Sequence, residues 1–222
     1  MGRRTTATAE DRRRADLESR LLPVLEDARR LGLVGPGPLL RHLDHALGFA
    51  PHPLVGACLD LGSGAGLPGL PLALAWPDTT WVLVDAGERR VQFLARAVAA
   101  VGAEDRLVVV EGRAEELARR HDLRGRFDLV VARGFGPPAV TAECGAGFLA
   151  VGGRMVVSEP PGGRPDRWPA AGLAPVGLEP GESFTAAGSW YQVLRQTVPC
   201  SDRFPRRVGI PAKRPLFVTA PD

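Results

Sequence analysis

The sequence has few cysteines and no long apolar segment. Only Cys58, Cys144 and Cys200 occur, and their wide spacing is not that of a metal site. An odd, sparse count is typical of a reducing compartment, so we expect a cytoplasmic protein. No stretch of about 18 apolar residues is present, which argues against a membrane span. The arginine-rich first 20 residues also lack the apolar region of a secretory signal.

The histidines and the net charge exclude few further functions. His42 and His45 would share one helix face, but without a nearby cysteine or third histidine we predict no metal site. The net charge of +3, with a pI near 9.1, permits nucleic-acid binding without requiring it. Arginines and a lysine gather at positions 3–14 and 203–214. The first group is equally consistent with solvated charge on a flexible end.

The 222 residues, 45% of them hydrophobic, suit about one domain. We expect a disordered basic tail over residues 1–14 and a helical segment over 15–53, with Pro23 interrupting its first helix. A catalytic core over 54–200 and a basic tail over 201–222 follow. We expect a monomer, because such a chain can bury its core by itself.

Strand and helix patterns alternate through the core. Apolar strands are predicted at residues 55–61, 80–85, 106–112, 127–134 and 154–159, with helical patterns at 67–77, 88–102, 114–123 and from 139. Two further strands, 173–183 and 189–197, have no helix between them. This order predicts an α/β, doubly wound, mainly parallel sheet of seven strands, closed by a C-terminal antiparallel hairpin. That arrangement favours a Rossmann-like class I methyltransferase over a standard dinucleotide fold.

The stretch CLDLGSGAGLPG, residues 58–69, contains two overlapping motifs. From Gly64 it reads as the G-x-G-x-x-G turn of NAD-binding proteins. From Asp60 it reads as an acid followed by alternate glycines, as in S-adenosylmethionine (SAM) methyltransferases. The first register places Asp60 inside the strand and Gly62 at its end, and both residue types are unfavourable in strands. The second ends the strand at Asp60, so we prefer a SAM site and keep an NAD dehydrogenase as a distant alternative.

The residues around this loop suit a nucleoside ligand. Alternate glycines let the backbone approach the ligand without Cβ clashes. Asp85 ends the second strand and can accept hydrogen bonds from both ribose hydroxyls, although an acid does the same in NAD proteins. We expect backbone groups of Ala114 and Glu115 to contact adenine. For the Glu115 and Glu116 side chains, the alternative is ordinary first-turn acids stabilised by the helix dipole.

Six segments together resemble one family. They are LLRHLDHAL, DLGSGAGLPGLPLALAWPD, VDAGERRVQFL, GRAEEL, FDLVVARGF and FPRRVGIPAKRPL. Over roughly residues 38–217 the chain resembles the bacterial ribosomal small-subunit methyltransferase G family (glucose-inhibited division protein B). The resemblance implies SAM-dependent methylation of guanosine N7 in 16S ribosomal RNA. Ribosomal RNA or the small ribosomal subunit would then be the partner.

The resemblance also assigns roles to residues. Arg133 is the catalytic candidate, holding guanine or a phosphate beside the methyl group, unless it pairs with Asp85, Glu111 or Glu159 for structure. The candidate cofactor contacts are Asp60, Gly62, Ser63, Gly64, Gly66, Leu67, Asp85, Arg90, Ala114, Glu115 and Arg133. The candidate RNA contacts are Arg206, Arg207, Lys213 and Arg214.

One departure from the family keeps other functions open. Glu159 stands where the family commonly has a lysine, and a free carboxylate there would repel phosphate. A small-molecule SAM methyltransferase, or a non-catalytic module that binds SAM or RNA, is therefore the alternative to an RNA methyltransferase. RNA affinity and its salt dependence would distinguish the first, and SAM binding without transfer would identify the second.

Overall fold

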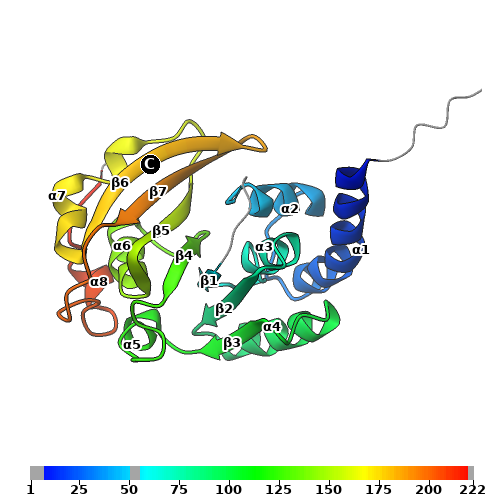
Figure 1. Ribbon diagram of the computed structural model, residues 1–222, viewed down its shortest axis with the longest axis horizontal. Coiled ribbons are helices and arrows are strands. Elements are labelled where there is room, and N and C mark those ends of the chain that lie inside the picture. Colours follow the sequence, from blue (N-terminus) through cyan, green and yellow to red (C-terminus); the bar gives the residue numbers. More distant parts are fainter. Residues whose placement is uncertain (1–7, 51–55, 220–222) are drawn as a thin grey trace, which may run out of the picture.

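A seven-stranded sheet forms the centre of the molecule, with helices on both faces (Figure 1). The computed structural model describes residues 8–50 and 56–219. The strand order is β3-β2-β1-β4-β5-β7-β6, with β7 antiparallel to both of its neighbours. The strands are β1 (Gly56–Leu61), β2 (Thr79–Asp85), β3 (Leu107–Glu111), β4 (Phe127–Ala132), β5 (Leu149–Glu159), β6 (Leu178–Ala186) and β7 (Ser189–Gln196). The predicted fold class is confirmed.

Two hydrophobic cores hold the helices against the sheet. The first joins one sheet face, including Trp81 and Leu83, to α1 (Ala9–Arg30), α2 (Leu39–Leu47), α3 (Gly69–Ala75) and α4 (Glu88–Ala100). The second joins the other face, including Leu59 and Val130, to α5 (Ala114–Leu117), α6 (Pro138–Ala146) and α7 (Ala170–Leu173). The short helix α8 (Ile210–Lys213) packs beside α6. Each face therefore buries apolar side chains, as expected for parallel strands.

The strand order places the ligand-binding edge. Strand β1 lies between β2 and β4, so the chain leaves β1 toward one side and returns on the other. Open α/β sheets bind ligands in the crevice at the carboxyl ends of such strands. The residues that follow β1, β2, β3 and β4 are therefore brought together, although they are far apart in the sequence.

The N-terminal helix begins earlier than predicted. Thr8 and Asp11 form a reciprocal capping box, in which the Thr8 side chain accepts from Asp11 N–H and the Asp11 carboxylate accepts from Thr8 N–H. Residues 9–14 are therefore helical, and the prediction of disorder there was wrong; residues 1–7 lie outside the described residues. Pro23 lies inside α1 without ending it. Leu21 and Leu25, buried on either side of it, supply packing that offsets the lost backbone bond.

Other boundaries differ in smaller ways. Residues 173–177, predicted as strand, form the end of α7 and the 3-10 turn η2 (Ala174–Val176), and Gly177 at φ 78° precedes β6. A second 3-10 turn, η1 (Pro165–Arg167), precedes α7. The helix α8 was not predicted. The predicted boundary between the helical segment and the core, at residues 53 and 54, lies outside the described residues. Within the described part, no helix combines the length and apolarity that a membrane crossing requires.

Candidate cofactor and acceptor site

A cavity of about 660 Å³ lies at the carboxyl edge of the first four strands. It brings together many predicted cofactor residues, namely Gly62, Gly64, Asp85, Arg90, Ala114, Glu115 and Arg133. Gly32 and Leu33, between α1 and α2, and Ala212 of α8 also line it. Sequence reasoning missed these three because small or apolar residues carry no chemical pattern.

All three glycines of the loop have left-handed φ angles, and two of them also leave no space for a side chain. Gly62, Gly64 and Gly66 have φ angles of 72°, 56° and 78°. A Cβ on Gly62 would lie 2.7 Å from the Phe135 ring, and one on Gly66 would collide with Leu70. A Cβ on Gly64 would meet only a backbone oxygen at 3.8 Å. The space beside Gly64 is therefore open to the cavity, where a ligand can approach the backbone.

Asp60 contacts the end of the glycine loop through its buried side chain. Its side chain is buried, and its Oδ2 accepts from Gly69 N–H at 2.9 Å, while Oδ1 has no hydrogen-bond partner among the described residues. Burial raises the pKa of Asp60 to about 7. Strand β1 continues through Asp60 to Leu61, one residue beyond the end that the SAM register assigned to it. The argument against an aspartate inside this strand was wrong, because the Gly69 amide satisfies one of its oxygens.

Two further predicted loop residues are also buried rather than open to the main cavity. The Ser63 hydroxyl donates to Asp60 O at 3.2 Å, and Leu67 packs in the first core. Both line a smaller cavity, together with Gly64 and Arg133. Gly66 lines neither cavity in the described structure; its amide donates to Ser63 O. These residues shape the loop.

Asp85 ties the loops after β1 and β2 together. Its Oδ2 accepts from Gly64 N–H at 3.0 Å, and its Oδ1 accepts from Gly87 N–H at 2.8 Å and Arg90 Nε at 2.7 Å. A carboxylate offers about four lone-pair sites. Three are used, and one of these is used by a half-exposed arginine side chain. Asp85 therefore keeps room for hydroxyl donors from the cavity.

The segment after β3, which we predicted to contact adenine, is coupled to the C-terminal tail. Glu115 is buried, and its Oε1 accepts from Gly209 N–H at 3.1 Å and from Arg113 Nη2 at 3.3 Å. Burial raises the pKa of Glu115, but the hydrogen bonds from Gly209 and the local backbone, together with the Arg113 guanidinium, outweigh this effect and hold the pKa below its ordinary value. The carboxylate thus anchors the tail, and Gly112 to Glu115 line the cavity.

Arg133 lies where the first cavity meets a second one of about 350 Å³. Its Nη2 is 2.9 Å from His42 Nδ1, and its buried Nη1 has no hydrogen-bond partner in the described part of the chain. Arg133 forms no ion pair with Asp85, Glu111 or Glu159. Asp85 pairs instead with Arg90, and Glu159 pairs with Arg167. Burial lowers the pKa of the Arg133 guanidinium. A partly buried cation with donors to spare is suited to hold a ligand.

The wall of the second cavity contains an acid, Glu159, that is paired with an arginine. Glu159 accepts from Arg167 Nη1 at 2.7 Å and from Trp168 Nε1 at 2.8 Å. Its side chain is nearly buried, at 4% exposure. Phe135 and His45 also line this cavity. The predicted repulsion of phosphate assumed a free carboxylate at this position, whereas the paired Glu159 presents little net charge.

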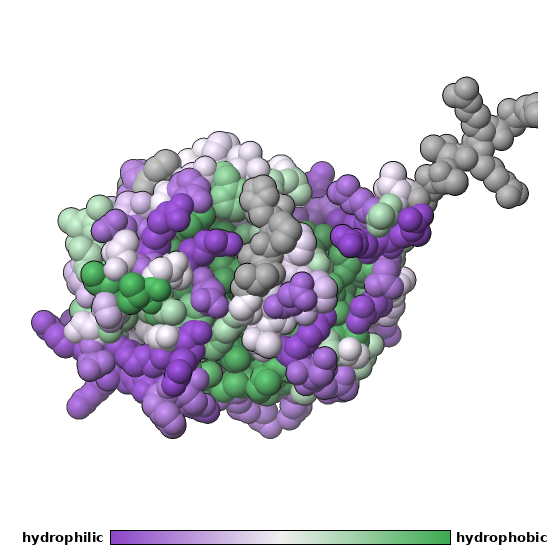
Figure 2. Space-filling model, viewed as in Figure 1, coloured by the Kyte–Doolittle hydropathy of each residue, from purple (hydrophilic) through white to green (hydrophobic). Residues whose placement is uncertain are grey.

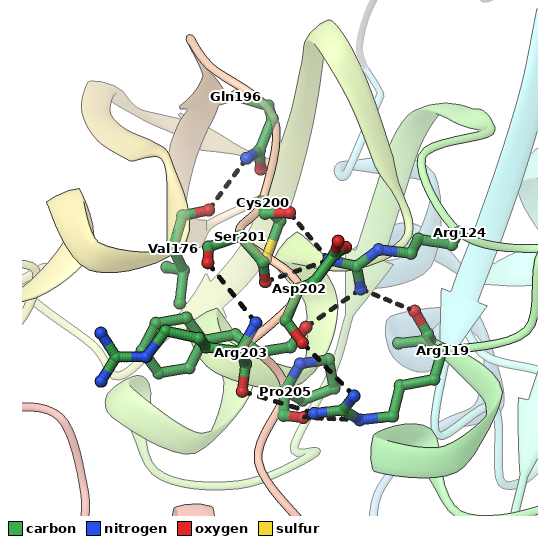
Figure 3. A network of polar contacts seen from close by, with 11 residues as sticks. Arg119, Arg124, Val176, Gln196, Cys200, Ser201, Asp202, Arg203 and Pro205 are labelled. Atoms are coloured by element: carbon green, nitrogen blue, oxygen red, sulfur yellow. Dashed lines mark hydrogen bonds and ion pairs between the residues drawn. The ribbon is translucent and has the colours of Figure 1, made fainter.

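The C-terminal tail is pinned to the core by arginines. Arg124 donates to Cys200 O at 2.7 Å and to Phe204 O at 3.0 Å, and Arg119 donates to Pro205 O at 2.7 Å. Figure 3 shows the guanidinium group of Arg124 pointing toward Cys200 and that of Arg119 pointing toward Pro205. Phe204 is buried in the second core. The tail from residue 200 to Pro205 is therefore part of the folded body.

The four predicted RNA contacts divide into two groups. Arg206 is held by Glu143, a fully buried acid of α6 that accepts from its Nε at 2.9 Å and its Nη2 at 2.6 Å. Arg207, Lys213 and Arg214 are exposed. Hydrophilic residues gather over the region of α5 and α8, at the lower left of Figure 2. Three of the four side chains are therefore accessible from solvent, whereas the Arg206 side chain is paired with Glu143.

The sequence comparison identifies the family. A model described as rRNA small subunit methyltransferase G matches residues 39–159. The chain belongs to this methyltransferase family. The protein of that name from Moorella thermoacetica is 37% identical over 166 residues, covering 71% of this chain and 68% of its own. The one from Rubrobacter xylanophilus is 33% identical over 215 residues, covering 87% and 80%. The predicted resemblance is confirmed.

Solved structures support the same fold. The mitomycin 7-O-methyltransferase MmcR superimposes with a TM-score of 0.55 at 14% identity, covering 72% of this chain and 54% of its own. A protein from Corynebacterium glutamicum superimposes with a TM-score of 0.51 at 16% identity, covering 87% and 93%. At such low identities the likeness concerns the fold alone.

No group of three potential metal ligands occurs within residues 8–50 and 56–219.

Proposed function

We propose that this methyltransferase family member transfers a methyl group from SAM to N7 of a guanosine in 16S ribosomal RNA. The observation that carries the proposal is the pair of adjoining cavities at the carboxyl edge of the sheet, which share Arg133 to Gly136. One cavity suits a nucleoside cofactor and the other suits an acceptor base. The names of the curated relatives support RNA as the substrate.

The residues of the first cavity fit SAM. The open space beside Gly64 would receive the methionine and ribose part, and Asp85 would accept from the ribose hydroxyls. Backbone groups of Ala114 and Glu115 would contact adenine. Arg90 would remain close to Asp85 or to the methionine carboxylate, whereas Asp60, Ser63, Gly66 and Leu67 would shape the loop. When bound, SAM supplies a methyl group activated by its sulfonium.

The acceptor requires little chemistry from the protein. Guanine N7 already presents a lone pair, so no general base is needed. The contribution of the chain is then proximity and orientation, which can be worth about 7–11 kcal/mol. Arg133 lies at the boundary of both cavities, and an arginine recognises the guanine acceptors O6 and N7. Bonding O6 or a phosphate would leave N7 free to face the first cavity.

The exposed basic residues of the tail would contact RNA phosphates. We propose Arg207, Lys213 and Arg214 for this role, with Arg206 anchoring the segment that presents them. The tail reaches the cofactor cavity, since Ala212 lines it. We propose a catalytic unit over residues 54–200, completed by the preceding helical segment, which begins at Ala9, and by the tail 201–222. It would act as a cytoplasmic monomer on 16S RNA or the small ribosomal subunit.

The test is transfer of labelled methyl from SAM to 16S RNA and to small subunits that lack the modification. Wild type is compared with Asp85→Ala and with the control Asp78→Ala, which changes an exposed acid near the opposite end of β2. We expect label at guanosine N7, detected by chain cleavage at 7-methylguanosine, in wild type and in the control only. Absence of label in both RNA substrates would refute the proposal. Label on a base atom other than N7 would refute the N7 assignment.

A further inference from the structure

His42 of α2 contacts Arg133 across a separation of 91 residues. Its Nδ1 is 2.9 Å from Arg133 Nη2, and its Nε2 lies 3.2 Å from both Gly35 O and Pro36 O. An arginine can only donate hydrogen bonds and a carbonyl oxygen can only accept them. Nδ1 must therefore be the acceptor, and Nε2 must carry the proton. All three contacts select one neutral tautomer of the ring.

This contact acts on a side chain that would otherwise be poorly held. Arg133 forms no ion pair with Asp85, Glu111 or Glu159, and its Nη1 lacks a partner among the described residues. An arginine side chain carries about 2 kcal/mol of rotamer entropy. The hydrogen bond to His42 is the directional contact that the structure records for the guanidinium within residues 8–50 and 56–219.

The support behind His42 comes from the connection between α1 and α2. Gly35 and Pro36 hold its Nε2, while Gly32 and Leu33 of the same connection line the cofactor cavity. Arg41 and His45 are the other basic groups of α2 near it, and Arg133 lies opposite on the segment after β4. The connection before the sheet therefore contributes to the site at two places: Gly32 and Leu33 line the cavity, and the carbonyls of Gly35 and Pro36 hold His42.

We propose that His42 is a positioning residue, which orients Arg133 at the junction of the two cavities through the tautomer that Gly35 and Pro36 select. This inference rests on the proposed function, since it takes Arg133 to contact the acceptor. It assigns the connection between α1 and α2 a direct part in building the active site. Misplacing a group by about 1 Å can cost 10²-fold in rate.

The experiment compares His42→Ala, His42→Asn and His42→Gln with the control Leu40→Ala, an exposed residue of the same helix. Asparagine can place an acceptor near the former Nδ1, whereas glutamine reaches the Nε2 position. With saturating SAM and RNA, we expect His42→Ala to lower kcat about 10–100-fold with KM for RNA and Kd for SAM changed less than about threefold. His42→Asn should recover most of kcat, and His42→Gln should not.

Two results would overturn the inference. One is a kcat of His42→Ala within twofold of wild type, and the other is equal behaviour of the asparagine and glutamine variants. Nitrogen-15 NMR of the histidines in the wild-type protein tests the contact without any activity, and a ring protonated at Nδ1 at neutral pH would contradict it. A wild type that labels no RNA would refute the proposed function, while the NMR result would still decide the His42–Arg133 contact.

Discussion

Replacing Arg206 tests whether this arginine anchors the tail. Glu143 is fully buried and accepts from Arg206 N–H at 2.8 Å as well as from two guanidinium nitrogens. Arg206→Met would leave that carboxylate with its backbone donor only. Breaking a buried pair costs about 3–5 kcal/mol. Because the Arg206 side chain is 27% exposed, we expect the lower end, about 3 kcal/mol.

The assay is thermal unfolding, extended to a double-mutant cycle. For a chain of 222 residues, 3 kcal/mol corresponds to a Tm lower by roughly 6–12 °C. The control Arg207→Met, at the exposed neighbour, should stay within about 0.5 kcal/mol of wild type. Glu143→Leu combined with Arg206→Met should recover much of the loss, because no unpaired charge remains. Equal stability of the two single arginine variants would refute the anchoring role.

Three further outcomes are expected. Asp85→Ala should abolish SAM binding in calorimetry without binding of NAD appearing, and undiminished SAM affinity would contradict its proposed role. Burial raises the pKa of Asp60 to about 7, so its contribution to stability is complete below about pH 4 and is lost as pH rises through 7. Urea unfolding should show that Asp60→Asn removes this slope, worth up to about 4 kcal/mol, and a slope unchanged in the variant would exclude Asp60. Neutralising Arg207, Lys213 or Arg214 should each reduce the salt slope of RNA binding by about 1, whereas an unchanged slope would exclude that phosphate contact.

The order of the helices and strands could be predicted from local sequence patterns. The alternation of apolar strands and amphipathic helices predicted the strands around β1 to β5, because side-chain periodicity reports burial within a single segment. The glycines after Asp60 indicated the ligand-binding loop for a similar reason, since positive φ angles are a local demand. The start of α1 at Ala9 was readable from Thr8 and Asp11 but was obscured by the arginine run.

The contacts that complete the site depended on the tertiary structure. His42 meets Arg133 across 91 residues, Arg206 meets Glu143 across 63, and Gly209 meets Glu115 across 94. No pattern within a segment specifies such pairs, because each forms only where the sheet and the packed helices bring two distant backbones together. The sequence by itself thus determined the fold and the position of the glycine loop. The folded chain decided which arginine is an anchor and which faces the cavities, since burial and available partners are properties of the packed state.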